Sequence, residues 1–572
     1  MKKIIPVLVA IVLIVIIGAV AFGGKIVEKY SYSKERADLN VYFGVTAEDE
    51  IAIIMQDEII EEKAKLIGST VYFDFATVDK YFTDRFYVSE EEKLLLFTTA
   101  DDVIRIQIGD ESDVIYVSDI GNSLEYKAAL YEGDTLYIAA DYIKKYVNMS
   151  YNLYGDPMHM QVYTEWGMVN EAKVTEDTSV RIKGGIKSAI LTDVSAGDKV
   201  IVLEEMETWT KVKTQTGFIG YVENKQLASA SLVEQEPVTD AMEVVINSIQ
   251  KDGTINMVFH QVFDVDSNGK PSKLLKNTKG VNVIAPTWFR LSDNEGNFTS
   301  IASEAYVTNA HENGVEVWAL ITDVDSKSLY GVDIDFYELL SSSANRERLI
   351  DGLMAQVDTY DLDGINIDFE QVKSNAGTHF IQFLRELSIE TRKRGVVLSV
   401  DNYVPTEYTA HYNRKEQGLV VDYVVIMGYD EHYAGGGVAG SNASIDYVEN
   451  GIIKTKESVP ANKIINAIPF YTKVWESGSE GLNVSTLTME NQDEWVENSG
   501  ATPMWLDEYC QSYVELEKDG NVYQCWLEDE ESIKVKLQVM QAQDIAGVAA
   551  WKLGIEDTDI WEVIGQYVDG SM

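Results

Sequence analysis

The sequence predicts a multidomain α/β protein whose C-terminal part is a (β/α)8 TIM barrel with an insertion before strand eight. Three observations lead to this prediction. The chain has 572 residues, which is too many for one ordinary domain. From about residue 243 onward, eight apolar strand-like segments alternate with helix-like ones. Ahead of them, short strand-like segments separated by turn residues indicate a small α+β module and a small β-barrel.

The strands of the predicted barrel are near-continuous apolar runs, which are typical of parallel strands buried on both faces under helices. The eight segments are 255–262, 281–289, 315–321, 364–370, 396–404, 423–429, 464–471 and 548–553. Segments of helical character lie between most of them, for example 344–360, 378–394, 445–456 and 530–544. This spacing over residues 243–567 fits a (β/α)8 barrel. The largest insertion, 473–527, is expected to form a wall of a substrate site.

The stretch 363–370 (DGINIDFE) carries a row of polar side chains. Side chains alternate across a strand, so three large apolar residues fall on one side. The other side carries Asn366, Asp368 and Glu370. Polar groups gathered opposite apolar ones predict a strand whose polar face lines a barrel interior or a cleft.

The C-terminal ends of the strands are where barrels of this kind hold their chemistry. Besides Asp368 and Glu370, the residues expected there are Trp288, Asn402, Tyr403, Met427, Tyr429, Asp430, Glu431, Tyr471 and Trp551. Carboxylates within a ring of aromatic side chains suit a sugar substrate and acid catalysis. The ten Trp and 32 Tyr of the chain agree with that substrate class.

The composition of the chain argues against several classes of binding partner. A formal net charge of −46 argues against nucleic acid and anionic lipid surfaces, because like charges repel. No Cys/His cluster indicates zinc, and no cofactor is expected. Residues 264–269 imitate a calcium loop, but Leu275 stands where a bidentate Glu is required, so a turn is predicted. Cys510 and Cys525 are either one disulfide or two free thiols.

The N-terminus predicts export. Lys2 and Lys3 precede an almost unbroken apolar run from Ile4 to Phe22, long enough to span a bilayer. Residues 1–24 are therefore expected to anchor the protein in the membrane, followed by a stalk over 25–42. The alternative is a cleaved signal peptide, because 19–21 has the small-x-small form of a cleavage site. In both cases the bulk of the chain is extracytoplasmic.

Two modules precede the barrel. In residues 43–165 a strand followed by a short helix occurs twice, at 70–82 and at 134–146. This segment resembles the module named after the N-terminal domain of copper amine oxidases, although nothing in it indicates copper. Residues 172–228 resemble bacterial SH3 domains, which implies either contact with cell-wall peptides or a spacer. An acidic linker is expected at 229–242.

The stretch DGINIDFE resembles the D-G-x-D-x-D-x-E signature of glycoside hydrolase family 18, the chitinase-like fold. Three further segments agree in order and place: 427–430 on strand six, 550–551 on strand eight and 285–289 on strand two. The last resembles a bacterial subgroup that includes spore-cortex and cell-wall hydrolases. The resemblance covers about 243–567.

This resemblance implies substrate-assisted catalysis with retention, in which the 2-acetamido oxygen of the sugar attacks C1. Glu370 is then the general acid and later the base. Asp368 orients the acetamide and Tyr429 donates a hydrogen bond to its oxygen. Asp430 contacts sugar hydroxyls, and Trp551 stacks under the sugar.

One position departs from the family pattern. Asn366 stands where the signature has its middle aspartate. Its amide is expected to hydrogen-bond Asp368 but cannot take up charge, so a changed pH profile is expected. Asn366 and Asp363 complete the expected substrate-binding set.

The sequence thus predicts an exported glycosidase that cleaves β-1,4 bonds beside N-acetylglucosamine, in peptidoglycan or in chitin. The SH3-like module favours peptidoglycan, with wall contact through that module and membrane contact through the N-terminal helix. The alternative is a lectin that binds these glycans on the same barrel without cleaving them. Glu370 favours the enzyme, because a binding protein does not need the acid.

Overall fold

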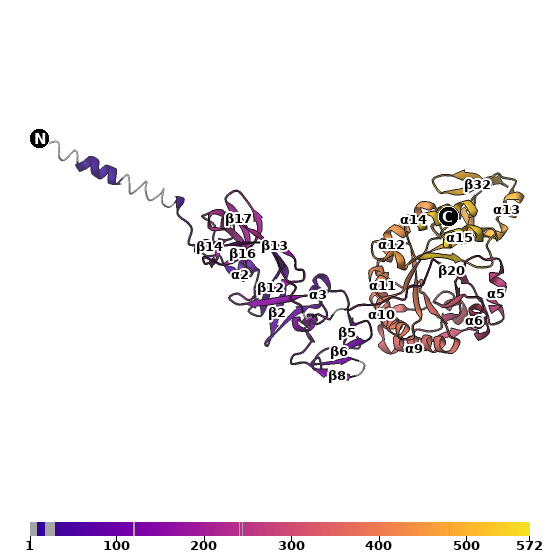
Figure 1. Cartoon of the computed structure of the whole chain (residues 1–572), viewed down its shortest axis with the longest axis horizontal. Coiled ribbons are helices and arrows are strands. Elements are labelled where there is room, and N and C mark those ends of the chain that lie inside the picture. Colours follow the sequence, from indigo (N-terminus) through magenta and orange to yellow (C-terminus); the bar gives the residue numbers. More distant parts are fainter. Residues whose placement is uncertain (1–8, 18–28, 118–119, 240, 243, 480) are drawn as a thin grey trace. The chain divides into compact units, whose positions relative to one another are not determined.

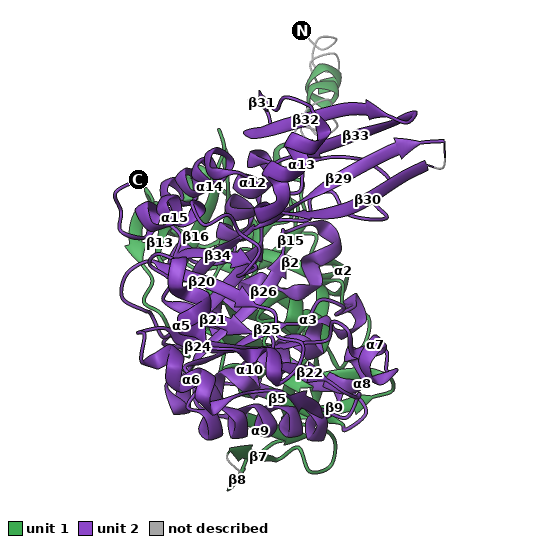
Figure 2. Ribbon diagram, turned by 90° about the vertical axis from the view of Figure 1, so that its right-hand side faces the viewer, with its two compact units in different colours: residues 1–86, 93–96, 104–244 green, residues 87–92, 97–103, 245–572 purple. Residues whose placement is uncertain are grey.

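The structure, a computed structural model, describes residues 9–17, 29–117, 120–239, 241–242, 244–479 and 481–572. The chain forms two compact units (Figure 2). The first comprises residues 1–86, 93–96 and 104–244, and the second comprises 87–92, 97–103 and 245–572.

Eight parallel strands close a barrel in the second unit (Figure 1). Each strand pairs in parallel with its neighbours, and β34 pairs with both β28 and β20, which closes the ring. The strands are β20 (Ile255–His260), β21 (Val283–Pro286), β24 (Glu316–Thr322), β25 (Gly364–Asp368), β26 (Val397–Tyr403), β27 (Tyr423–Met427), β28 (Ile464–Pro469) and β34 (Gly547–Trp551). The predicted (β/α)8 barrel is confirmed. Its second segment differs in detail, because β22 (Phe289–Leu291) is separate from β21 and pairs with β23 (Phe298–Ser300).

The barrel strands are buried on both faces. Inward side chains such as Met257, Leu320 and Val425 form a core inside the barrel. Outward side chains such as Ile365 and Ile367 belong to the core under the helices. This double burial is the physical reason for the near-continuous apolar strands in the sequence.

Helices cover the outside of the strands (Figure 1). The side chain of Ser342 caps α9, and Asp529 forms a capping box with Ser532 at the start of α14, which satisfies free backbone N–H groups. The long helices are α6 (Glu304–His311), α9 (Ser343–Tyr360), α10 (Gly377–Arg394), α11 (Arg414–Val420), α12 (Ile445–Lys456), α14 (Glu530–Ala542) and α15 (Ile560–Val568). Shorter ones are α5 (Pro271–Leu274), α7 (Ser326–Tyr330) and α8 (Phe336–Ser341).

An insertion with its own sheet lies between β28 and β34, where the sequence places the largest insertion. Five antiparallel strands follow the order β30-β29-β33-β32-β31. Their bounds, with the helix of the insertion, are β29 (Tyr471–Gly478), β30 (Gly481–Thr488), α13 (Gln492–Ser499), β31 (Met504–Leu506), β32 (Gln511–Lys518) and β33 (Asn521–Trp526). A small apolar cluster that includes Val474, Leu487 and Val514 holds the sheet together.

The two cysteines do not form the disulfide that the sequence allowed. Both are free thiols. Cys525 lies opposite Val514 in the ladder between β33 and β32, whereas Cys510 precedes β32. Four residues along a strand separate Cys510 from the position opposite Cys525, about 13 Å at the usual rise per residue, which is beyond disulfide reach.

Residues 87–92 and 97–103 belong to the barrel unit although they are distant from it in sequence. The Tyr87 hydroxyl lies 2.7 Å from Nδ1 of His379 on α10. On the barrel side, Arg346 of α9 makes a bidentate ion pair with Glu386 of α10 and lies over the Tyr87 ring. The second segment is held by Gln382 of α10, whose side-chain amide donates to Oγ1 of Thr98 over 3.1 Å. These polar contacts attach the two segments to the outer helices.

The first unit contains two seven-stranded sheets that share one apolar core with α2 (Leu39–Phe43). The first sheet has the order β11-β12-β1-β2-β3-β10-β9. The expected strand-then-helix pattern occurs twice. Its elements are β3 (Thr70–Asp74) with α3 (Phe75–Tyr81) and β10 (Thr135–Ala139) with α4 (Ala140–Ile143). The resemblance to the copper amine oxidase module stays a prediction.

The remaining strands of the first sheet are β1 (Glu50–Met55), β2 (Glu58–Ile67), β9 (Ala129–Glu132), β11 (Ser150–Tyr154) and β12 (His159–Tyr163). The second sheet is antiparallel and falls on the expected SH3-like region. Its strands are β13 (Met168–Lys173), β14 (Thr178–Arg181), β15 (Ile190–Val194), β16 (Lys199–Glu205), β17 (Trp209–Thr214), β18 (Ile219–Glu223) and β19 (Ser231–Glu234). A third sheet is formed by β4 (Phe86–Ser89), β5 (Leu94–Thr98), β6 (Val103–Gln107), β7 (Val114–Val117) and β8 (Ile120–Ser123).

The predicted membrane segment lies mainly outside the described residues. Of the apolar run from Ile4 to Phe22, residues 9–17 are described, and they are helical. Within the described part of the chain, no helix is both long and apolar enough to cross a membrane.

Candidate active site

A cavity of about 760 Å³ lies over the C-terminal ends of the barrel strands. It is lined by Phe259, Asp368, Glu370, Asp401, Tyr403, Val404, Thr406, Thr409, Met427, Tyr429, Asp430, Glu431, Tyr433, Tyr447, Tyr471 and Trp551. Five of these residues are acids, and no Lys, Arg or His occurs among the described residues that line it. The arrangement is a carboxylate-rich cavity with aromatic walls, which suits a polyhydroxylated neutral ligand.

Glu370 is the second residue beyond the end of β25 and is held from three sides. The Tyr403 hydroxyl donates a hydrogen bond of 2.7 Å to Oε2 of Glu370. The Glu370 backbone N–H donates to Oδ1 of Asp323 over 2.8 Å, and the Tyr412 hydroxyl donates to the Glu370 carbonyl oxygen over 3.1 Å. The backbone contacts fix the turn after the strand, and the Tyr403 contact fixes the carboxyl group.

Burial raises the pKa of Glu370, the hydrogen bond from Tyr403 lowers it, and the charge of Asp430 raises it. The net pKa lies above the ordinary value. A carboxyl group with a raised pKa stays protonated closer to neutral pH and can deliver its proton to a bound ligand. Glu370 therefore has the environment of a general acid.

Asp368 lies two residues before Glu370, on the inward face of β25. Burial raises the pKa of Asp368 well above its usual value, and the charges of Asp401, Glu370 and Asp323 raise it further. Burial is also the main reason why the pKa of Asp401 rises to about 8 and that of Asp323 to about 6. Four acids thus share one poorly solvated region and favour protonated forms.

Asn366 lies one inward position below Asp368. Its amide nitrogen donates to Oγ of Ser399 over 3.0 Å and to Oδ1 of Asp401 over 2.9 Å, both on β26. The amide donor is thus directed to the neighbouring strand and not to Asp368, which corrects the expected partner. The Asn366 carbonyl oxygen is buried and has no hydrogen-bond partner.

The rim of the cavity includes residues that the insertion fixes in place. The Tyr471 hydroxyl donates to Oδ1 of Asp430 over 2.7 Å, and Nζ of Lys473 binds the same oxygen. Lys473 also donates to Oδ1 of Asn442 over 2.6 Å. Glu431 is turned toward the start of α12, where it accepts a hydrogen bond of 2.8 Å from the Ser444 backbone.

Aromatic side chains form the floor and one wall. The Trp551 ring lies 5.4 Å from that of Phe259, between centroids, at the end of β34. Tyr429 lines the cavity and meets Tyr471 edge to face, with 6.2 Å between centroids. Burial raises the pKa of Tyr429 well above its usual value, so its hydroxyl stays a donor.

Ten of the predicted residues gather at this end of the barrel. They are Asn366, Asp368, Glu370, Tyr403, Met427, Tyr429, Asp430, Glu431, Tyr471 and Trp551. All but Asn366 line the cavity, and Asn366 contacts it through Asp401.

Three predicted site residues lie elsewhere. Trp288 is fully buried among the outer core residues, with its indole N–H donating to Asn268 and its ring against Tyr306. Asp363 precedes β25 at the opposite end of the barrel, where it contacts His311. Asn402 points away from the barrel interior and is held by Gln417 of α11. These three placements correct the expectation from the sequence.

Asp401 and Asp323 are acids of the site that sequence reasoning missed. The signal for Asp401 was available, because alternation along β26 places Ser399, Asp401 and Tyr403 on one face and Asn402 on the other. Asp323 follows the end of β24, so strand alternation does not fix the direction of its side chain.

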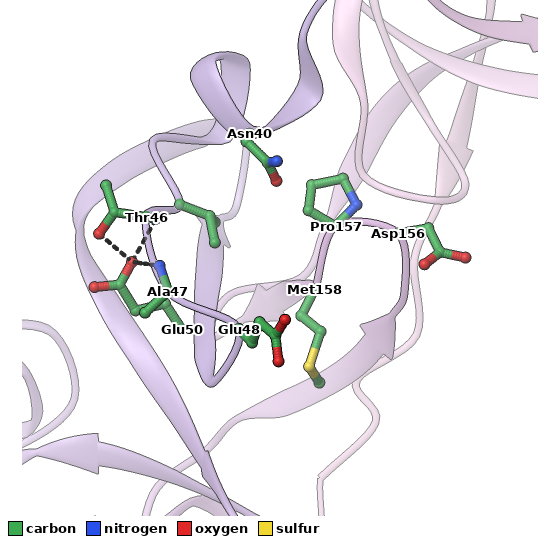
Figure 3. Close-up of a pocket in the computed structure, with 9 residues that line it drawn as sticks. Asn40, Thr46, Ala47, Glu48, Glu50, Asp156, Pro157 and Met158 are labelled. Carbon is green, nitrogen blue, oxygen red and sulfur yellow. Dashed lines mark hydrogen bonds between the residues drawn. The ribbon is translucent and has the colours of Figure 1, made fainter.

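A smaller cavity of about 300 Å³ lies in the first unit (Figure 3). The carboxylate of Glu50 in this cavity already binds its own loop, because its Oε2 accepts hydrogen bonds from the Thr46 and Ala47 backbone N–H groups at 2.7 and 3.1 Å.

The described residues contain no group of three or more His, Cys, Asp or Glu side chains arranged to hold a metal ion.

Comparisons with known proteins agree with this geometry. The model of the family described as glycosyl hydrolases family 18 matches residues 327–556, and that of the bacterial SH3 domain matches residues 176–228. The chain is 27% identical over 305 residues to the uncharacterized glycosylase YvbX of Bacillus subtilis, covering 51% of this chain and 86% of that protein. It is 26% identical over 156 residues to the cortical fragment-lytic enzyme of Bacillus anthracis, covering 27% of this chain and 36% of that protein.

Among solved structures, the C-terminal domain of a candidate chitinase from Desulfitobacterium hafniense DCB-2 matches with a TM-score of 0.50 and 19% identity. The match covers 55% of this chain and 100% of that domain. At this identity the match supports the barrel fold alone.

Proposed function

We propose, on the premise that the barrel is a family 18 glycosyl hydrolase domain and the protein a glycosidase, that it cleaves β-1,4 bonds next to N-acetylglucosamine. The observation that carries this proposal is the buried carboxyl group of Glu370, which Tyr403 orients into a carboxylate-rich, aromatic cavity. Its raised pKa supports the role of proton donor to the glycosidic oxygen.

The nucleophile in this proposal is the substrate itself. As Glu370 protonates the leaving oxygen, the 2-acetamido carbonyl oxygen attacks C1 and forms an oxazolinium ion. Asp368 accepts a hydrogen bond from the acetamide N–H and stabilises the positive charge, while the Tyr429 hydroxyl donates to the attacking oxygen. Glu370 then takes a proton from water, which opens the ring with retention. The position of Asp368 and Glu370 side by side in the lining of the cavity supports these roles.

The remaining walls suit a sugar ring. Trp551 offers an aromatic face at the floor, on which the apolar face of a sugar can stack. Asp430 is held by Tyr471 and Lys473 and can accept hydrogen bonds from sugar hydroxyls. Net charge of −46 and the absence of a basic side chain among the described lining residues favour a neutral glycan segment at the cavity.

Peptidoglycan is the favoured polymer, with chitin as the alternative. Support comes from the cortical fragment-lytic relative and from the SH3 domain at 176–228, for which we propose wall contact. The apolar run from Ile4 to Phe22 supports an extracytoplasmic protein that stays attached to the membrane.

The test is hydrolysis of N-acetylglucosamine oligomers and of purified peptidoglycan by the full-length protein, with release of reducing ends as the readout. Glu370→Gln is expected to lower turnover by about 10³-fold while oligomer binding survives. Glu407→Gln, at an exposed glutamate outside the cavity lining, is the matched control and keeps the parent turnover. Binding without cleavage by the parent protein would identify a lectin, and cleavage by Glu370→Gln at the parent rate would exclude Glu370 as the acid.

A further inference from the structure

Two buried carboxylates of the site lie level with each other on neighbouring strands. Strands β25 and β26 are parallel, and Ile367 pairs with Val400 in their register. The next residue on each strand is Asp368 and Asp401, respectively. Both side chains line the cavity. Adjacent parallel strands lie about 4.8 Å apart, so two inward side chains at the same level are direct neighbours.

Asn366 fixes the orientation of Asp401. Its amide donates to Oδ1 of Asp401 over 2.9 Å and to Oγ of Ser399 over 3.0 Å. The amide at position 366 therefore donates a hydrogen bond to Asp401 at every pH and never carries a charge, whereas an acid there would be a neutral donor only while it is protonated.

The surroundings of this pair disfavour two negative charges. Asp401 is 4% exposed and Asp368 is 8% exposed. Burial raises the pKa of both carboxyl groups, and each additional charge nearby raises them further. Titratable groups face the pair from every packed element: Asp323 after β24, Glu370 after β25, Tyr403 on β26, Tyr412 in the loop after β26, Tyr429 after β27 and, beyond it, Asp430. None of these groups is a cation.

We infer that Asp401 is a positioning residue of the reaction that shares a single proton with Asp368, and so supplies from strand β26 the second acid that Asn366 removes from β25. The inference deepens the proposed function and rests on it. The reactive form of the pair is the one that has lost its first proton; in it the remaining proton is on Asp368 before the attack, and Asp401 is the carboxylate. As the acetamide acquires positive charge, the O–H bond of Asp368 breaks and an O–H bond forms on Asp401. The pair carries one negative charge throughout, and that charge moves to the side of the substrate.

The pH dependence follows from the shared proton. A pair that shares a proton loses its first proton more readily, and its second less readily, than one acid alone. Asp401→Asn leaves Asp368 as the only acid of the pair, so no proton is shared. The acid limb of kcat/KM is therefore expected to move to higher pH, and the alkaline limb that reports loss of the second proton is expected to disappear.

The experiment compares the parent, Asp401→Asn, the swap Asn366→Asp/Asp401→Asn and the control Asp361→Asn, all as full-length protein on N-acetylglucosamine oligomers. Asp361 is an exposed residue at the end of α9 in the left-handed conformation that Asn adopts readily, so its variant keeps the parent profile. Asp401→Asn is expected to lower kcat at least tenfold. The swap is expected to recover kcat to within about threefold of the parent and to restore the acid limb, because one acid and one amide are again present.

Two results would overturn the inference. The first is that the parent is active and Asp401→Asn has the same kcat and the same pH profile as the parent. The second is a swap variant with the parent melting temperature that stays as impaired as Asp401→Asn, because then only the amide network matters. If the parent cleaves neither oligomers nor peptidoglycan, the proposed function itself is wrong. Failure of the proposed function can therefore be told apart from failure of the inference about Asp401.

Discussion

The Tyr403 hydroxyl donates a hydrogen bond of 2.7 Å to Oε2 of Glu370 from the strand next to the one that Glu370 follows. Burial and the charge of Asp430 raise the pKa of Glu370, whereas this bond lowers it because it stabilises the carboxylate. Tyr403 thus both aims the acid and limits how far its pKa rises. It connects β26 to the chemistry of β25 at the mouth of the cavity, one inward position above Asp401.

Replacing Tyr403 by Phe is expected to extend activity to higher pH. Glu370 must be protonated to act as the acid, so activity falls as pH rises through its pKa. Removal of the stabilising bond raises that pKa, and the alkaline limb of the kcat/KM profile moves up. The freed carboxyl group is also less well aimed, and maximal kcat should fall about tenfold, equivalent to about 1.4 kcal/mol. Tyr408→Phe, at a side chain that is 91% exposed and outside the cavity lining, is the control. A limb that moves to lower pH would contradict the assignment.

Alternation along a strand predicted which side chains share the inward face at the end of β25. Asn366, Asp368 and Glu370 share the inward face that their spacing predicts. The same rule, applied to β26, selects Asp401 and excludes Asn402, which faces Gln417.

Other parts of the site needed the fold. Trp288 follows the end of β21, where the chain turns and alternation no longer applies, so its side chain enters the outer core. Asp363 belongs to the predicted motif but precedes its strand, at the end of the barrel away from the cavity. The contact of Lys473 with Asp430 depends on how the insertion folds, which residue patterns around Lys473 do not specify.

Replacement by Phe is expected to lower the stability of the protein at Trp288 and to raise KM at Trp551. Trp288→Phe loses the hydrogen bond to Asn268 and leaves a space in a fully buried site. We expect a loss of about 1–3 kcal/mol of stability, visible as a lower melting temperature, with KM for the oligomers unchanged. Trp551→Phe presents a smaller ring to the sugar and is expected to raise KM several-fold with little change in melting temperature. Oligomer kinetics and thermal unfolding of both variants test this, and a raised KM in Trp288→Phe would place Trp288 in the site after all.

The two thiols are expected to react with iodoacetamide at different stages of unfolding. Cys510 is partly exposed, whereas Cys525 is fully buried in β33 and burial raises the pKa of its thiol to about 12. The thiolate is the reactive form, so the native protein should be labelled at Cys510 alone and the denatured protein at both. Mass spectrometry of tryptic peptides, without reductant, gives the readout. Recovery of a cross-linked peptide containing both residues would contradict the strand register.

Asp401→Asn is expected to flatten the pH dependence of stability. The pKa of Asp401 is about 8 in the folded protein, above the ordinary 3.8, because burial disfavours its charge. A carboxyl group whose pKa is raised by folding contributes fully to stability below its unfolded pKa, and that contribution is lost as pH rises toward the folded value. The parent should therefore lose stability between about pH 4 and pH 8, and Asp401→Asn should lose less.

Thermal unfolding of the barrel at pH 5 and pH 8 measures the difference. At pH 8 we expect the melting temperature of the variant to exceed that of the parent by more than about 3 °C. Asp323, whose pKa of about 6 is also raised by burial, is present in both proteins and cancels in the comparison. Equal slopes in the parent and Asp401→Asn, with Asp361→Asn as the reference, would mean that Asp401 does not titrate in this range.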